Sequence, residues 1–132
     1  SLGRTQKSDY SAIVFGCVDT DGVFWVDADI ERRDPWKMLS RCIDLQTMYS
    51  FSAFGIETNQ FQQILEPLLQ KLAAERGMAV PTYGIHQSMD KTDRINIGLT
   101  PYLRQRKFRF RSNSPGAALL IEQMREQVQN VE

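Results

Sequence analysis

The chain has 132 residues, of which 42% are hydrophobic and 24% charged, the composition of an ordinary globular protein with one domain. Sixteen basic residues balance sixteen acidic ones, so net charge indicates no nucleic-acid partner and only the distribution of charge can. No apolar run reaches the ~18 residues of a membrane span, and no signal peptide is recognisable. Cys17 and Cys42 lack a metal-type spacing and are expected as small core residues of a cytoplasmic protein.

The first expected elements form a hairpin. Ser11–Val18 is almost continuously apolar, which predicts a strand covered on both faces. The turn sequence Asp19–Gly22 follows, and Val23–Ile30 then alternates between apolar and polar residues. We therefore predict two antiparallel strands.

Helices and short strands follow. Asp34 and Pro35 are typical of a helix start, and helical periodicity continues to about Tyr49. After a short strand over Phe51–Ile56, a second helix is expected to end at Gly77, with a kink or late start at Pro67. The remaining expected elements are a strand over Val80–His86, a helix over Asp90–Leu99, a strand over Phe108–Phe110 and a final helix from Ser114-Pro115. This order predicts one domain of α/β or α+β class, with helices flanking a mixed sheet.

Glu57 is the first candidate site residue. It stands where the strand 51–56 gives way to a helix, and ligands in open α/β sheets collect at such strand ends. A rigidly held carboxylate suits Mg²⁺, which needs hard oxygen ligands. Asp9 is the one nearby acid with a reason to converge on it, and Asn59 is a cap residue two positions later. The alternative is that Glu57 opens a surface loop.

We expect structural roles for the remaining acidic residues of the hairpin and find no nucleophilic triad. Expected in the turn or on a solvated strand face are Asp19, Asp21, Asp27 and Asp29. His86 is the single histidine, and no serine or cysteine stands near a base, so a nucleophilic triad has no support. Phosphate-loop and dinucleotide glycine patterns are absent from the sequence, which argues against nucleotide hydrolysis.

Basic residues concentrate late in the chain. After Lys91 and Arg94, the segment 104-RQRKFRFR-111 carries five positive side chains, with Phe108 and Phe110 interleaved. Such clustering is typical of phosphate binding. The alternative is an edge strand whose charges prevent aggregation.

Five segments, taken together and in order, resemble the C-terminal nuclease domain of the terminase large subunit of tailed bacteriophages and prophages. They are 8-SDYSAIVFG-16, 27-DADIERRDPW-36, 54-FGIETNQFQ-62, 90-DKTDRI-95 and 99-LTPYL-103. The resemblance covers nearly the whole chain and implies an RNase H-like fold and endonucleolytic cleavage of concatemeric viral DNA during packaging. It further implies two Mg²⁺ or Mn²⁺ ions that activate water and stabilise charge on the phosphodiester.

The resemblance also assigns residues. Glu57 matches the acid on the fourth strand of that fold, which would bridge or position the metal, and Asp9 matches an acid close to the metal site in some relatives. Lys91 and Arg94 match a basic pair that approaches DNA, and we expect further DNA contacts from Asn59, Arg104, Arg106 and Lys107. Double-stranded DNA, the terminase small subunit and the portal are the implied partners, in the cytoplasm of a bacterial host.

The sequence departs from that family at both ends. An Asp-Pro-Ser motif on the first strand and an aspartate-rich segment after the last helix have no counterpart between Ser1 and Glu132. We therefore expect a domain truncated at both ends and catalytically incomplete, with an unpaired strand edge that favours self-association. The alternatives are a non-catalytic module that binds DNA or a packaging partner, and a decayed prophage product.

Overall fold

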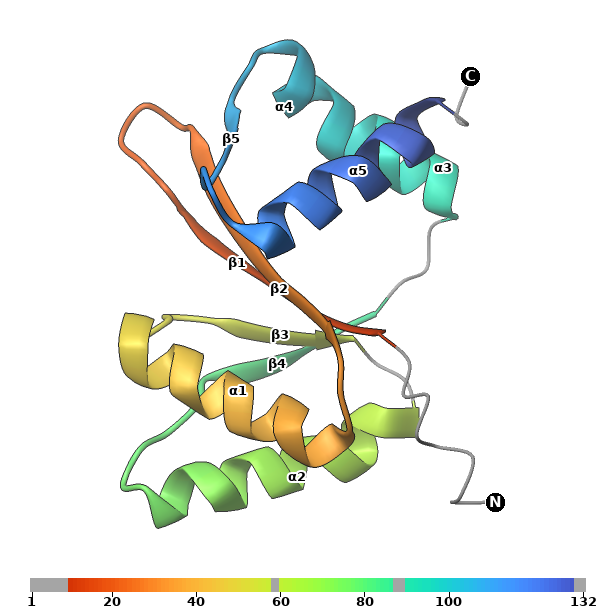
Figure 1. Cartoon of the computed structure of the whole chain (residues 1–132). Coiled ribbons are helices and arrows are strands. Elements are labelled where there is room, and N and C mark those ends of the chain that lie inside the picture. Colours follow the sequence, from red (N-terminus) through yellow and green to blue (C-terminus); the bar gives the residue numbers. More distant parts are fainter. Residues whose placement is uncertain (1–9, 58–59, 87–89, 130–132) are drawn as a thin grey trace. The chain divides into compact units, whose positions relative to one another are not determined.

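The first two strands form the predicted hairpin. In the computed structural model, which describes residues 10–57, 60–86 and 90–129, β1 (Tyr10–Val18) pairs antiparallel with β2 (Phe24–Arg32). The short strand β5 (Phe108–Phe110) joins the other side of β2 in parallel, which gives a mixed sheet of order β1-β2-β5 (Figure 1). In the turn, the Asp19 carboxylate accepts the backbone N–H groups of Asp21 and Val23 and the indole N–H of Trp25.

The prediction that the first strand is covered on both faces is wrong. Ile13 is buried, but Val14 and Val18 on the other face of β1 are 55% and 54% exposed. Cys17 is exposed too, so its expected place in the core is also wrong. The physical reason is that β1 is an edge strand of its sheet, whereas the final helix packs along the central strand β2.

That final helix, α5 (Pro115–Gln129), approaches β2 closely at its first turn. A Cβ atom on Gly116 would lie 1.7 Å from the carbonyl oxygen of Ala28, so glycine is required for this contact. Ala117 and Ala28 are both buried there. The predicted helix over residues 90–99 begins as α3 (Lys91–Arg94) and a π-helical segment (Ile95–Leu99), and continues into α4 (Thr100–Arg104).

A second group of elements contains α1 (Pro35–Tyr49), β3 (Phe54–Glu57), α2 (Gln60–Glu75) and β4 (Thr82–Ile85). The predicted helix cap is confirmed, since the Asp34 carboxylate accepts the N–H of Lys37 at 2.9 Å. β3 and β4 pair in parallel as a separate sheet. Buried in this group are Leu39, Cys42, Ile43, Leu45, Leu69, Ala73 and Val80.

The contacts divide the chain into two units. The first unit comprises Ser1–Arg32 and Met89–Glu132, and the second comprises Arg33–Ser88. The expected α/β class with a mixed sheet is confirmed, while the expectation of one domain stays a prediction. α2 begins at Gln60 and runs through Pro67, so the helix does not start late.

Candidate functional site

Glu57 is the last residue of β3, in the second unit. Its register partner in the parallel strand β4 is Ile85, so both strands end at the same edge, and His86 follows directly on β4. Glu57 and His86 are both exposed. The side chain of Glu57 forms no hydrogen bond or ion pair with any residue that the structure describes. Glu57 and His86 therefore both stand where the two parallel strands end, the edge at which ligands collect in open α/β sheets.

The face of β3 that carries Glu57 is partly covered by side chains of β4. Gly55 lies two positions earlier on the same face. A Cβ atom at Gly55 would lie 2.5 Å from Cδ1 of Ile85 and 3.0 Å from the hydroxyl oxygen of Tyr83. These two side chains thus cover Gly55, and the carboxylate stands beside them at the end of the strand.

Hydrogen bonds from α2 hold the start of β4 in place. The Thr82 hydroxyl donates to Oε1 of Glu66 at 2.8 Å, and Nε2 of Gln70 lies 2.9 Å from both Thr82 Oγ1 and the Val80 carbonyl oxygen. These bonds fix the start of β4 to α2, at the opposite end of the strand from His86.

The residues do not complete a metal site by themselves. No group of three or more His, Cys, Asp or Glu side chains that could hold a metal ion occurs in the described part of the chain. Asp9 and Asn59, the predicted companions of Glu57, lie outside that part. A single carboxylate does not hold a divalent ion in the octahedral geometry that Mg²⁺ requires, so we derive no metal-dependent step.

Within the predicted basic segment, some side chains bond to other residues of the fold and others have no described partner. Arg111 Nη1 lies 3.4 Å from Oδ2 of Asp27, and Arg109 Nη1 donates to the carbonyl oxygens of Arg106 and Phe108. These two guanidinium groups therefore support β5, which is an edge strand. The edge-strand interpretation of the charges fits Arg109 and Arg111.

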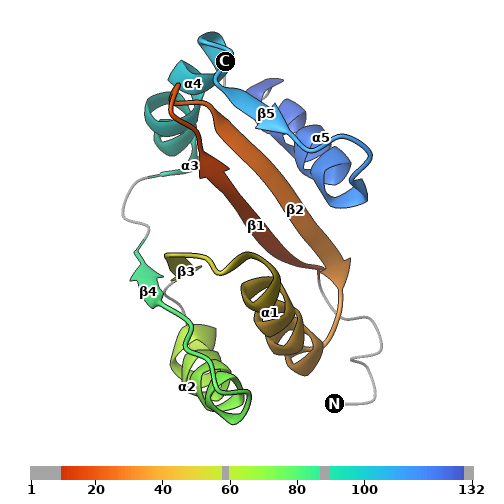
Figure 2. The same ribbon diagram turned by 90° about the vertical axis from the view of Figure 1, so that its left-hand side faces the viewer.

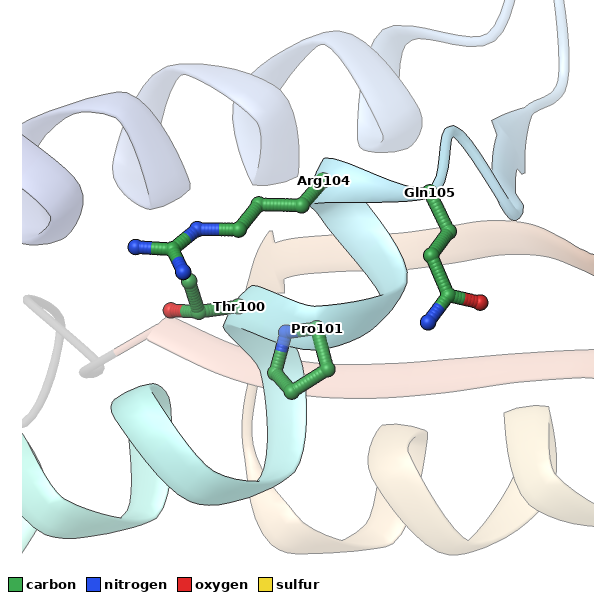
Figure 3. A pocket seen from close by; sticks show the side chains of 4 residues that line it. All are labelled: Thr100, Pro101, Arg104 and Gln105. Carbon is green, nitrogen blue, oxygen red and sulfur yellow. The ribbon is translucent and has the colours of Figure 1, made fainter.

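Arg104 and Arg106 differ from them. Both are exposed, and neither side chain bonds to any described residue. With Gln105 and Lys107 they form a segment from the last residue of α4 to the start of β5, which we call the basic turn. Arg104 and Gln105 line an open hollow of about 630 Å³ with Thr100 and Pro101 (Figure 3). Guanidinium, amide and hydroxyl groups are the side chains that commonly contact phosphate.

The backbone of the basic turn is specialised. Arg106 has φ of 57°, in the left-handed region that favours glycine. The N–H of Arg106 donates to the carbonyl oxygen of Leu103, and the N–H of Lys107 to that of Tyr102. These bonds define a Schellman motif that ends α4, with arginine where glycine is usual. A non-glycine residue held there against its conformational preference is a candidate for function.

An aromatic cluster anchors the basic turn. The Phe24 ring lies 4.8 Å from that of Tyr102 and 5.3 Å from that of Phe108, and Phe110 lies 5.9 Å from Phe108, all between ring centroids. Phe108 and Phe110 are thus half-buried packing residues, and Arg109 between them is exposed.

The other predicted DNA contacts lie apart from this turn along the chain. Arg94 is exposed on α3, whereas the side chain of Lys91 lies outside the described part. Asp90 caps α3 by accepting the backbone N–H of Asp93 at 3.0 Å. A hydrogen bond between the two side chains and the negative charge of Asp90 raise the pKa of the Asp93 carboxyl. Within the basic turn itself, Lys107 is half-buried, unlike the exposed Arg104 and Arg106. Glu57 and Arg94 belong to different units, and the assignment of Arg94 to DNA stays a prediction.

Asp27 was misjudged from the sequence. It was expected on a solvated face, but its side chain is only 16% exposed and accepts from the Ser114 hydroxyl at 2.6 Å. Its partners Arg111 and Ser114 lie more than eighty positions away, and no local pattern signals such a pairing.

No family model, curated protein or solved structure matches the chain. Among the described residues, no helix has the length and hydropathy to cross a membrane.

Proposed function

We propose that this chain is a nuclease domain of the terminase large-subunit type, RNase H-like in fold, which acts on double-stranded DNA during genome packaging in the bacterial cytoplasm. The terminase small subunit and the portal are its partners in this proposal. The five sequence segments that resemble the family support the lineage, and the mixed α/β fold agrees with it.

One observation carries the proposal: Glu57 ends a strand whose parallel neighbour ends beside it, and its carboxylate has no described partner. A carboxylate at a strand end, without a partner among the described residues, suits a metal-dependent nuclease better than a structural role. In the complete site Glu57 would be one ligand of Mg²⁺ or Mn²⁺, which would supply an activated water and stabilise charge on the phosphodiester.

The basic turn supports DNA as the substrate. The side chains of Arg104 and Arg106 form no hydrogen bonds with described residues, and ring contacts among Phe24, Tyr102 and Phe108 pack the elements on either side of the turn. Two exposed guanidinium groups on an anchored turn are suited to the phosphate backbone.

Manganese binding tests the proposed role of Glu57. Calorimetric titration of the protein with Mn²⁺ is expected to show binding that Glu57→Gln weakens at least about tenfold, with Glu75→Gln, an exposed carboxylate at the end of α2, as the matched control. Incubation of supercoiled plasmid with Mn²⁺ reports any remaining cleavage. Equal Mn²⁺ affinity in all three proteins would contradict the nuclease role of Glu57.

The basic turn also fits a second function, a non-catalytic module that binds DNA or a packaging partner, because its exposed arginines need no metal ion to contact an acidic partner. Such a module would bind DNA with strong salt dependence, without Mn²⁺, and with no effect of Glu57→Gln.

A further inference from the structure

The outer edge of β1 is unusual for its length and lack of charge. β1 has nine residues, YSAIVFGCV, and none is charged. The opposite edge of the same sheet is the three-residue β5, which carries exposed Arg109. Figure 2 shows β1 along the side of the sheet away from β5. Charged or very short edge strands prevent unwanted pairing, and β1 has neither protection.

The hydrogen-bond pattern identifies the backbone groups on this edge. The N–H of Phe24 donates to the Lys107 carbonyl oxygen, and the Val26 carbonyl oxygen accepts the N–H of Arg111, so these β2 residues bond away from β1. Their register partners in β1 are Val18 and Gly16. Because bonding direction alternates along an antiparallel pair, Ala12, Val14, Gly16 and Val18 direct their N–H and C=O groups away from β2.

We propose that this edge binds a second copy of the same strand, antiparallel, with the two-fold axis at Val14. In that register Val14 faces Val14 of the second copy and Ala12 faces its Gly16, so these facing pairs have their backbone groups directed across the interface and alternate with pairs directed to β2, as in any antiparallel ladder. A continuous sheet of order β5-β2-β1-β1-β2-β5 results.

Self-pairing is favoured by the side chains as well. Val14 and Val18 are 55% and 54% exposed in the single chain, and the dimer would remove apolar surface from water at both positions. No like charges meet, because the strand has none. A strand that is uncharged throughout its length offers a charged partner no electrostatic complement, so a second copy fits this edge best. This inference does not depend on the proposed nuclease function.

Charge substitutions at Val14 test both the dimer and its register. We expect a dimer fraction that rises with concentration in sedimentation analysis, and Val14→Lys or Val14→Glu alone should weaken dimerisation at least about tenfold, because two like charges meet at the axis. Val14→Thr, a β-branched control, should retain the dimer.

A mixture of the two charged variants is the decisive test of the proposed register. An equimolar mixture of Val14→Lys and Val14→Glu should restore the dimer as a heterodimer, since opposite charges then face each other. Circular dichroism of each variant verifies that the monomer is folded. A monomeric wild-type protein at the highest concentration, a dimer unaffected by Val14→Lys, or a mixture that stays monomeric would each overturn the proposal.

Discussion

The hydroxyl oxygen of Ser114 lies 2.6 Å from Oδ1 of Asp27, and this bond joins the start of α5 to the middle of β2. The same oxygen accepts the N–H of Ala117 at 3.2 Å, so one side chain caps the helix and fastens it to the sheet. We predict that Ser114→Ala lowers the free energy of unfolding by about 1–2 kcal/mol in urea titration. Exposed Ser112→Ala is the control. Equal effects of the two substitutions would contradict the cap.

Gly116 tests the packing of the same helix. Its Cβ would meet the Ala28 carbonyl oxygen at 1.7 Å, whereas a Cβ at Gly98 meets nothing within 4 Å. Gly116→Ala should therefore destabilise the protein by about 1–3 kcal/mol, because backbone must move. Gly98→Ala should be neutral or slightly stabilising. Thermal unfolding of both variants measures the difference, and similar melting temperatures would show that α5 does not contact β2 this closely.

Acid should loosen the hairpin turn. The indole N–H of Trp25 and the backbone N–H of Val23 hold the pKa of the Asp19 carboxyl below its ordinary value. A lowered folded pKa gives stability that is present above the unfolded pKa and is lost as the pH falls through the folded one, here below about pH 4. The indole N–H resonance of Trp25 should shift over that range in nuclear magnetic resonance spectra.

Two comparisons complete the acid experiment. The indole resonance of exposed Trp36 serves as the internal reference, and in Asp19→Asn the Trp25 shift should disappear. Persistence of the shift in Asp19→Asn would assign it to another group.

Two substitutions of Arg106 should separate the effect of its backbone conformation on stability from the effect of its charge on DNA binding. Arg106→Gly relieves the left-handed backbone and should raise the free energy of unfolding by about 0.5–1 kcal/mol, while Arg106→Ala gives no such relief. Both substitutions remove the same charge and should weaken DNA binding equally. A loss of stability in Arg106→Gly would mean that the arginine side chain supports the fold.

Local chemistry made much of the fold predictable. The cap at Asp34 and the turn at Asp19 depend on residues within four positions of each other, and both were found from the sequence. The openness of β1 was missed because apolar periodicity reports the strand and not its place in the sheet. β1 became an edge through pairings that only the tertiary structure decides.

The candidate site was also predictable only where it depends on local sequence. Glu57 was placed at a strand end because strand and helix signals meet there, but the parallel register that makes β3 and β4 end at the same edge could not be predicted. The sequence identified the basic segment as a whole. It could not tell that Arg111 would be bound by Asp27, 84 positions away, while Arg104 would remain exposed.

The salt dependence of DNA affinity tests the central claim, that the basic turn contacts the phosphate backbone. The logarithm of affinity for a short duplex should fall linearly with the logarithm of salt concentration, and the double variant Arg104→Gln/Arg106→Gln should reduce the steepness by about 2. The matched double variant Arg76→Gln/Arg125→Gln removes the same charge elsewhere and should leave the slope close to that of the wild type. Equal slopes for both double variants would contradict the account.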